Sequence, residues 1–127
     1  MNADAHGLDR VTEKIIGCAY NVANTLGAGF LEKVYENALR IELRKEGLHV
    51  QQQHPVNVTY DGEIVGEYFA DLVVENAVVV ELKAVSGLDE IHMAQCLNYL
   101  KATDFKVCLL INFGKPKVEI KRIVNHF

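Results

Sequence analysis

The chain has 127 residues, of which 50% are hydrophobic and 24% are charged, and its formal net charge is −4. This composition is ordinary for one globular domain, and the charge excludes a surface that is basic throughout. No apolar run approaches the roughly 20 residues that cross a bilayer, and the first residues lack the basic-then-apolar order of a signal peptide. We therefore expect a single domain over residues 1–127, cytoplasmic and without a membrane segment.

Two amphipathic helices are predicted in the first third of the chain. Apolar residues recur every three or four positions from Asp9 to Leu26, and Gly27-Ala28-Gly29 ends this pattern. A second helix is predicted from Phe30 to Lys45, before Gly47. We expect its core face to consist of Leu31, Val34, Ala38 and Ile41, and its other, partly apolar face to consist of Glu32, Tyr35, Glu36 and Leu39.

Strand patterns follow from His49 onward. Pro55 lies inside the first of them, so this strand should lie at a sheet edge or start late. Asp61-Gly62 is a strong hairpin signal. The next strand leads into the stretch Tyr68–Lys83, which has the pattern of two short strands around a turn near Asn76.

The last third of the chain completes an α/β pattern. Asp89-Glu90 should begin a third helix that ends near Ala102, and a buried strand should run from Phe105 to Asn112. Val118–Val124 is predicted to be a last strand or a short helix. A right-handed crossover through the third helix would make the Phe105 strand parallel to the central one, so we expect a mixed sheet.

Cysteine and charge distribution give weaker indications. Cys18, Cys96 and Cys108 are far apart and lie within apolar patterns, so we expect reduced core residues. From residue 104 onward, five lysine and arginine residues stand against two acidic ones, which leaves a local basic face open.

Charged residues at the end of a valine strand are the main candidates for a functional site. Glu81 and Lys83 follow three valines and share one face, because residues two apart on a strand point the same way. A three-residue loop over 75–77 would place Asp71 opposite Glu81, whereas a two-residue turn would pair Asp71 with Val80. Two carboxylates that meet in this way suit a hard divalent cation. By spacing alone, the plainer interpretation is a Glu81–Lys83 ion pair, with Asp71 as an edge residue.

Three motifs resemble those of a known superfamily. Asp71, followed by Glu81-Leu82-Lys83, resembles the core of the PD-(D/E)XK nucleases, with Phe69-Ala70-Asp71 in place of the literal Pro-Asp. The segment from Gly29 through Glu32 to Tyr35 is similar to the Gly-x-x-Glu-x-x-Tyr signature of the GxxExxY protein family, a branch of that superfamily. Gln95-Cys96-Leu97-Asn98-Tyr99 is similar to the Gln-x-x-x-Tyr element of RecB-like nucleases.

This resemblance implies a three-layer restriction-endonuclease-like fold, with a mixed four- to five-stranded sheet flanked by helices. It also implies hydrolysis of DNA phosphodiester bonds by a metal-activated water. Asp71 and Glu81 would bind Mg²⁺ or Mn²⁺ together with the carbonyl of Leu82, and Glu32 would complete the metal shell directly or through water. The resemblance further assigns a catalytic role to Lys83 and Gln95, and a supporting role to Tyr35 and Tyr99.

A rival interpretation keeps the fold but not the chemistry. The chain would then be a catalytically silent module that binds nucleic acid or protein, which the acidic balance favours slightly. Self-association as a homodimer also stays open. Cleavage and binding assays on DNA separate the two interpretations.

Overall fold

The computed structural model describes residues 2–125, with side chains described from residue 7 onward. In this part of the chain, the elements are α1 (Asn2–Leu26), α2 (Glu32–Lys45), β1 (Val50–Tyr60), β2 (Glu63–Val74), β3 (Val78–Lys83), α3 (Glu90–Lys101), β4 (Val107–Asn112) and β5 (Glu119–Val124). The strands form one sheet in the order β1-β2-β3-β4-β5. The β3–β4 pair is parallel and the other pairs are antiparallel, so the predicted mixed sheet is confirmed.

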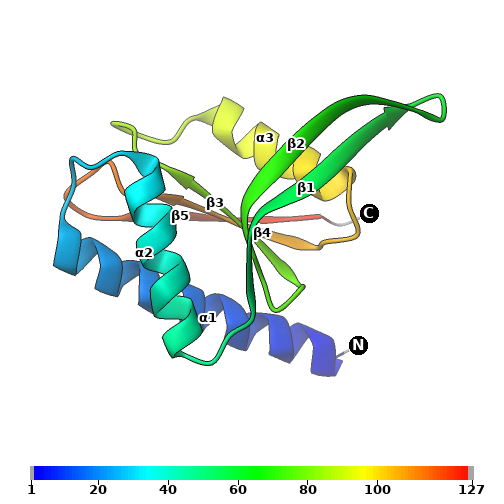
Figure 1. Cartoon of the computed structure of the whole chain (residues 1–127). Helices are drawn as coiled ribbons and strands as arrows, with labels where there is room; N and C mark the ends of the chain where they lie inside the picture. Colours follow the sequence, from blue (N-terminus) through cyan, green and yellow to red (C-terminus); the bar gives the residue numbers. More distant parts are fainter. Residues whose placement is uncertain (1, 126–127) are drawn as a thin grey trace.

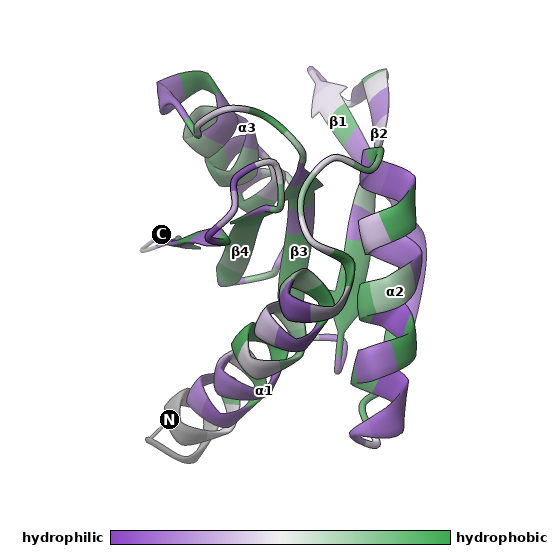
Figure 2. Cartoon of the chain, turned by 90° about the vertical axis from the view of Figure 1, so that its left-hand side faces the viewer, coloured by the Kyte–Doolittle hydropathy of each residue, from purple (hydrophilic) through white to green (hydrophobic). Residues whose placement is uncertain are grey.

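Helices cover both faces of this sheet. Helices α1 and α2 lie on one face and α3 lies on the other (Figures 1 and 2). Val78, Val80 and Leu82 of β3 belong to the apolar cluster under α1 and α2, whereas Val79 belongs to the cluster under α3. The central strand is thus buried on both sides, as its run of valines predicts. The result is the three-layer restriction-endonuclease-like architecture that we expected.

Several local predictions are confirmed. Asp61 and Gly62 have φ angles of 53° and 83° and form the two-residue loop of a hairpin, in which Tyr60 pairs with Glu63. Pro55 lies in β1, which is an edge strand. The hairpin of β1 and β2 projects well beyond the body of the molecule (Figure 1). The three cysteines are buried free thiols.

No helix of the described residues has the length and apolar character that crossing a membrane requires.

The predicted core face of α2 is wrong. Leu31 is 81% exposed and Ile41 is 52% exposed, whereas the buried face of α2 comprises Tyr35, Glu36, Leu39 and Leu43. Both faces carry apolar residues at helical spacing, so periodicity alone did not distinguish them. Burial of the polar groups on this face costs little free energy, because the Tyr35 hydroxyl and the Glu36 carboxylate both have hydrogen-bond partners.

Candidate active site

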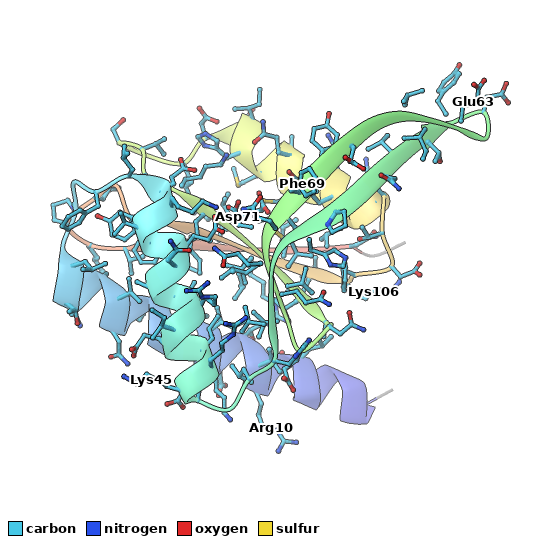
Figure 3. The ribbon with its side chains drawn as sticks, viewed as in Figure 1. Arg10, Lys45, Glu63, Phe69, Asp71 and Lys106 are labelled. Atoms are coloured by element: carbon cyan, nitrogen blue, oxygen red, sulfur yellow. The ribbon has the colours of Figure 1, made fainter. Side chains whose placement is uncertain are left out.

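Asp71 and Glu81 meet where β2 and β3 separate. The connecting loop spans residues 75–77, and the Ala77 N–H donates to the Val74 carbonyl at 3.0 Å. Leu72 pairs with Val80, so the next step in this register places Asp71 opposite Glu81. The three-residue loop is therefore confirmed, and the two carboxylates lie on the same side of the hairpin. Figure 3 shows Asp71 at the base of the projecting β1–β2 hairpin, whose tip carries Glu63.

The two carboxylates are fixed by reciprocal bonds to the opposing strand. The Asp71 N–H donates to Glu81 Oε2 at 2.8 Å, and the Leu82 N–H donates to Asp71 Oδ2 at 2.8 Å. At this point each carboxylate accepts a hydrogen bond from a backbone N–H of the opposite strand. Because both donors are part of the sheet, the carboxylates keep their positions without help from solvent.

Ionisation of both carboxylates at once is unfavourable. Burial, followed by the charge of Asp71, raises the pKa of Glu81 to about 9, and the ammonium of Lys83 acts in the opposite direction. The pKa of Asp71 is raised as well, chiefly by burial and then by the charge of Glu36. Glu81 is buried and Asp71 is half-buried, so a proton or a cation would offset the repulsion between the two carboxylates. The oxygen donors of this pair match those that hard divalent cations bind.

Glu81 and Lys83 open into a groove of about 730 Å³ between the β1–β2 hairpin and α3. Both residues line it, which confirms that they share a face. The other lining residues come from the hairpin and from α3 with the residue that follows it: Val56, Asn57, Val58, Thr59, Tyr68, Gln95, Asn98, Tyr99, Lys101 and Ala102. The fold thus brings Gln95 and Tyr99 to the same groove as Glu81. Burial, together with the charges of Glu81 and Asp71, raises the pKa of Tyr99 well above its usual range.

Residues 9–123 match the family model of the PD-(D/E)XK nuclease superfamily. The chain belongs to this superfamily. The matched segment contains Asp71, Glu81 and Lys83 and extends from α1 into β5. Searches among curated proteins and among solved structures gave no significant match.

Glu32 and Tyr35 of this PD-(D/E)XK protein belong to α2, and the charge of Glu32 adds to the burial that raises the pKa of Asp71. Glu32 is exposed at the start of α2. Within the described residues, no group of three or more His, Cys, Asp or Glu side chains is arranged to hold a metal ion. Tyr35 is fully buried, and its ring stacks on Phe113 at a centroid distance of 4.7 Å.

The Tyr35 hydroxyl holds the loop before α2. It donates to the Gly27 carbonyl at 2.6 Å and accepts from the Phe30 N–H at 3.1 Å. Both partners belong to the segment that joins α1 to α2. Tyr35 therefore ties this segment to the first turn of α2.

Sequence reasoning did not select Glu36 and Gln53. Glu36 is buried, pairs with Lys33 at 3.0 Å, and accepts from Gln52 and from Gln53. The Gln53 amide also reaches Asp71 Oδ1 at 3.4 Å, so a polar chain runs from α2 through β1 to the site. Gln53 has a φ of 56°, an uncommon value for a strand residue. The one available signal was that Glu36 lies on the same helical face as Tyr35.

A second polar cluster fixes the loop that follows Lys83. Asn112, fully buried at the end of β4, accepts from the N–H groups of Val85 and Gly114, both at 3.0 Å. Its amide nitrogen donates to the Val85 carbonyl at 3.0 Å and to Glu119 at 3.2 Å. The chain passes so closely here that a Cβ on Gly114 would lie 2.2 Å from the Val85 oxygen. This cluster anchors the segment between Lys83 and α3, which leads into the α3 wall of the groove.

Proposed function

We propose that this protein is a metal-dependent nuclease of the GxxExxY branch that hydrolyses DNA phosphodiester bonds. The observation that carries the proposal is the opposition of Asp71 and Glu81, held by reciprocal backbone bonds, with Lys83 beside Glu81 in an open groove. The signature residues Gly29, Glu32 and Tyr35 support the branch assignment.

Asp71 and Glu81 would hold the cation, Mg²⁺ or Mn²⁺. Each uses one carboxylate oxygen for a backbone N–H, and the second oxygen would bind the cation; in Asp71 this second oxygen also lies 3.4 Å from the Gln53 amide. A divalent cation would offset the repulsion that raises the pKa values of both groups. The carbonyl of Leu82 would add a further oxygen, and the exposed Glu32 would act through water. When bound, such a cation supplies positive charge against the phosphate and makes water more acidic.

Lys83 and the two α3 residues would act on the phosphodiester. The Lys83 ammonium would orient the attacking water or stabilise the negative charge that develops on the phosphate. Gln95 and Tyr99 stand four residues apart on α3 and line the same groove, where they would hold the backbone of the nucleic acid. Removal of one such electrostatic contribution typically lowers the rate by about 10²–10³-fold.

Cleavage assays test this proposal on single-stranded, duplex and branched DNA with Mg²⁺ or Mn²⁺. Lys83→Ala and Glu81→Gln should each lower the rate by about 100-fold or more while the fold is retained. Lys14→Ala, at an exposed position of α1, serves as the matched control and should keep the wild-type rate. Wild-type rates in both site variants would show that the roles are wrongly assigned. DNA binding without any cleavage by the wild-type protein would favour the catalytically silent module.

Thermal melting tests the cation site separately. A site filled by a tenfold excess over Kd stabilises the folded state by about 1.4 kcal/mol. For a chain of this size, such a change corresponds to an increase in Tm of about 5 °C. Asp71→Ala should abolish the increase that Mg²⁺ or Mn²⁺ produces. An unchanged Tm of the wild-type protein at millimolar metal would count heavily against a working site.

A further inference from the structure

The two walls of the groove meet through a pair of aromatic rings. Tyr68 of β2 and Tyr99 of α3 make an edge-to-face contact, with ring centroids 5.9 Å apart and an interplanar angle of 84°. Both tyrosines line the groove that contains Glu81 and Lys83. Tyr68 remains 53% exposed despite this contact, so a large part of its ring is accessible to a ligand.

The groove has the size of a small-ligand cleft. Its volume of about 730 Å³ lies within the range of about 300–1,000 Å³ that is typical of clefts for small molecules. The projecting hairpin forms one wall and α3 forms the other. This space suits one or two nucleotides, whereas a duplex gripped along its length would need a longer and wider surface.

The polar groups of the walls suit unpaired bases. Asn57 and Thr59 from β1 face the same space as Gln95 and Asn98 from α3, and these side chains offer both donors and acceptors. In a duplex, the Watson–Crick edges that such groups would bind are already paired. In a single strand these edges are free, and so are the ring faces of the bases.

The charge of the groove is small. Of the lining residues, Lys83 and Lys101 are basic and Glu81 is acidic, and the chain as a whole has a net charge of −4. The two lysines set an upper limit of about two neutralised phosphates, which matches a short segment of one strand. Proteins that track duplex DNA rely on more extended basic surfaces.

We propose that the groove between the β1–β2 hairpin and α3 is a single-strand site, in which a base stacks on Tyr68 and a neighbouring phosphate faces Lys83. The placement of the phosphate rests on the proposed nuclease function, because Lys83 lies two residues from Glu81, one of the two carboxylates that would hold the cation. The substrate class is then DNA with unpaired nucleotides, such as a single strand, a flap or a frayed end.

Fluorescence anisotropy with a short labelled oligothymidylate and a duplex of equal length tests the site, in buffer with Ca²⁺ and again with EDTA. The single strand should bind more tightly than the duplex. Tyr68→Leu keeps the apolar bulk but removes the aromatic face, so it should weaken single-strand binding by about 5- to 150-fold. Tyr68→Phe should stay within about twofold of the wild type. Tyr60→Leu is the matched control, because Tyr60 is 75% exposed near the tip of the same hairpin and does not line the groove.

Two further readouts come from the same titration. The chain has no tryptophan, so stacking on Tyr68 should quench part of the tyrosine emission, and Tyr68→Leu should remove that part. Neutralisation of two phosphates predicts a slope of log K against log salt concentration of about −1.4. A slope several times steeper would indicate a longer contact than the groove allows.

The outcomes separate this proposal from the nuclease function. Equal affinity for duplex and single strand, or equal losses in Tyr60→Leu and Tyr68→Leu, would overturn the single-strand site, even if the protein cleaves DNA. Binding that depends on Tyr68, with no cleavage in Mg²⁺ or Mn²⁺, would support the site and refute the nuclease function. With both correct, a flapped duplex should be cut within its single-stranded arm, and Tyr68→Leu should slow that cut.

Discussion

Replacement of Glu81 by glutamine should stabilise the metal-free protein at alkaline pH. Glu81 is 7% exposed and stands opposite a second carboxylate, and its pKa is raised from 4.5 to about 9. Between these values the unfolded chain has lost the proton that the folded protein retains. Folding therefore takes up a proton, and the stability falls as the pH rises through this window. Glutamine carries no charge and can still accept from the Asp71 N–H.

The size of the effect follows from proton linkage. Each pH unit between the two pKa values costs about 1.4 kcal/mol, which sets a ceiling of about 5 kcal/mol at pH 8. Solvent in the adjoining groove screens part of this charge, so we expect the variant to be more stable by about 2 kcal/mol. For a chain of this length, the corresponding increase in Tm is about 8 °C. Near pH 4.5 the difference should vanish, because Glu81 is then protonated in the folded wild-type protein.

Chemical denaturation of both proteins in EDTA, at several pH values from 4.5 to 8.5, measures this difference. The subtraction removes the contributions of titrating groups that do not interact with Glu81, whereas Asp71, which does interact with it, is part of the measured difference. Glu13→Gln, at an exposed position of α1, is the matched control and should show no such trend. Saturating Mg²⁺ should stabilise the wild-type protein and so reduce the advantage of the variant. A difference that does not change with pH, or a variant that is less stable at pH 8, would refute the reasoning.

Three further variants test the supports of the site by denaturation. Tyr35→Phe removes the hydroxyl that donates to the Gly27 carbonyl and should lower the free energy of unfolding by about 1–3 kcal/mol. A loss near zero would mean that water replaces this hydroxyl. Asn112→Ala leaves backbone groups of Val85 without partners and should cost about 2–4 kcal/mol, measured against an exposed Asn21→Ala control. Gly114→Ala should cost more than about 3 kcal/mol or prevent folding, because the Val85 oxygen would lie 2.2 Å from the new Cβ, and near-wild-type stability would show that this loop moves freely.

Local features of the chain were predictable where the deciding contacts are close in sequence. The Asp61-Gly62 hairpin depends on two adjacent residues that accept positive φ. Whether Asp71 lies opposite Glu81 depends on the length of the loop between them. The sequence left a two-residue turn and a three-residue loop open, and the pairing of Leu72 with Val80 agrees with the three-residue loop. The third helix begins at Glu90, and the side chain of its N-cap Asp89 accepts from the N–H groups of Ile91 and His92, as the sequence indicates.

Features that depend on contacts between distant segments were not predictable in the same way. Helix α2 has two partly apolar faces, and the sheet together with α1 decides which one is buried. That choice makes Glu36 an internal carboxylate that is linked through Gln53 to Asp71, and it leaves Glu32 exposed. Periodicity shows that a helix has an apolar face, but it does not show which surface of the protein that face will contact.

The amino-acid sequence by itself determined the order of the elements up to the last one and the shared face of Glu81 and Lys83, and it limited the register between Asp71 and Glu81 to two alternatives. Each of these follows from the fixed periods of strands and from the length of a loop. The tertiary structure alone decided the groove, because its walls come from a hairpin over residues 50–74 and a helix over residues 90–101. It also decided the contact between Tyr68 and Tyr99, since residues 31 positions apart meet only when α3 crosses the sheet and packs beside the hairpin.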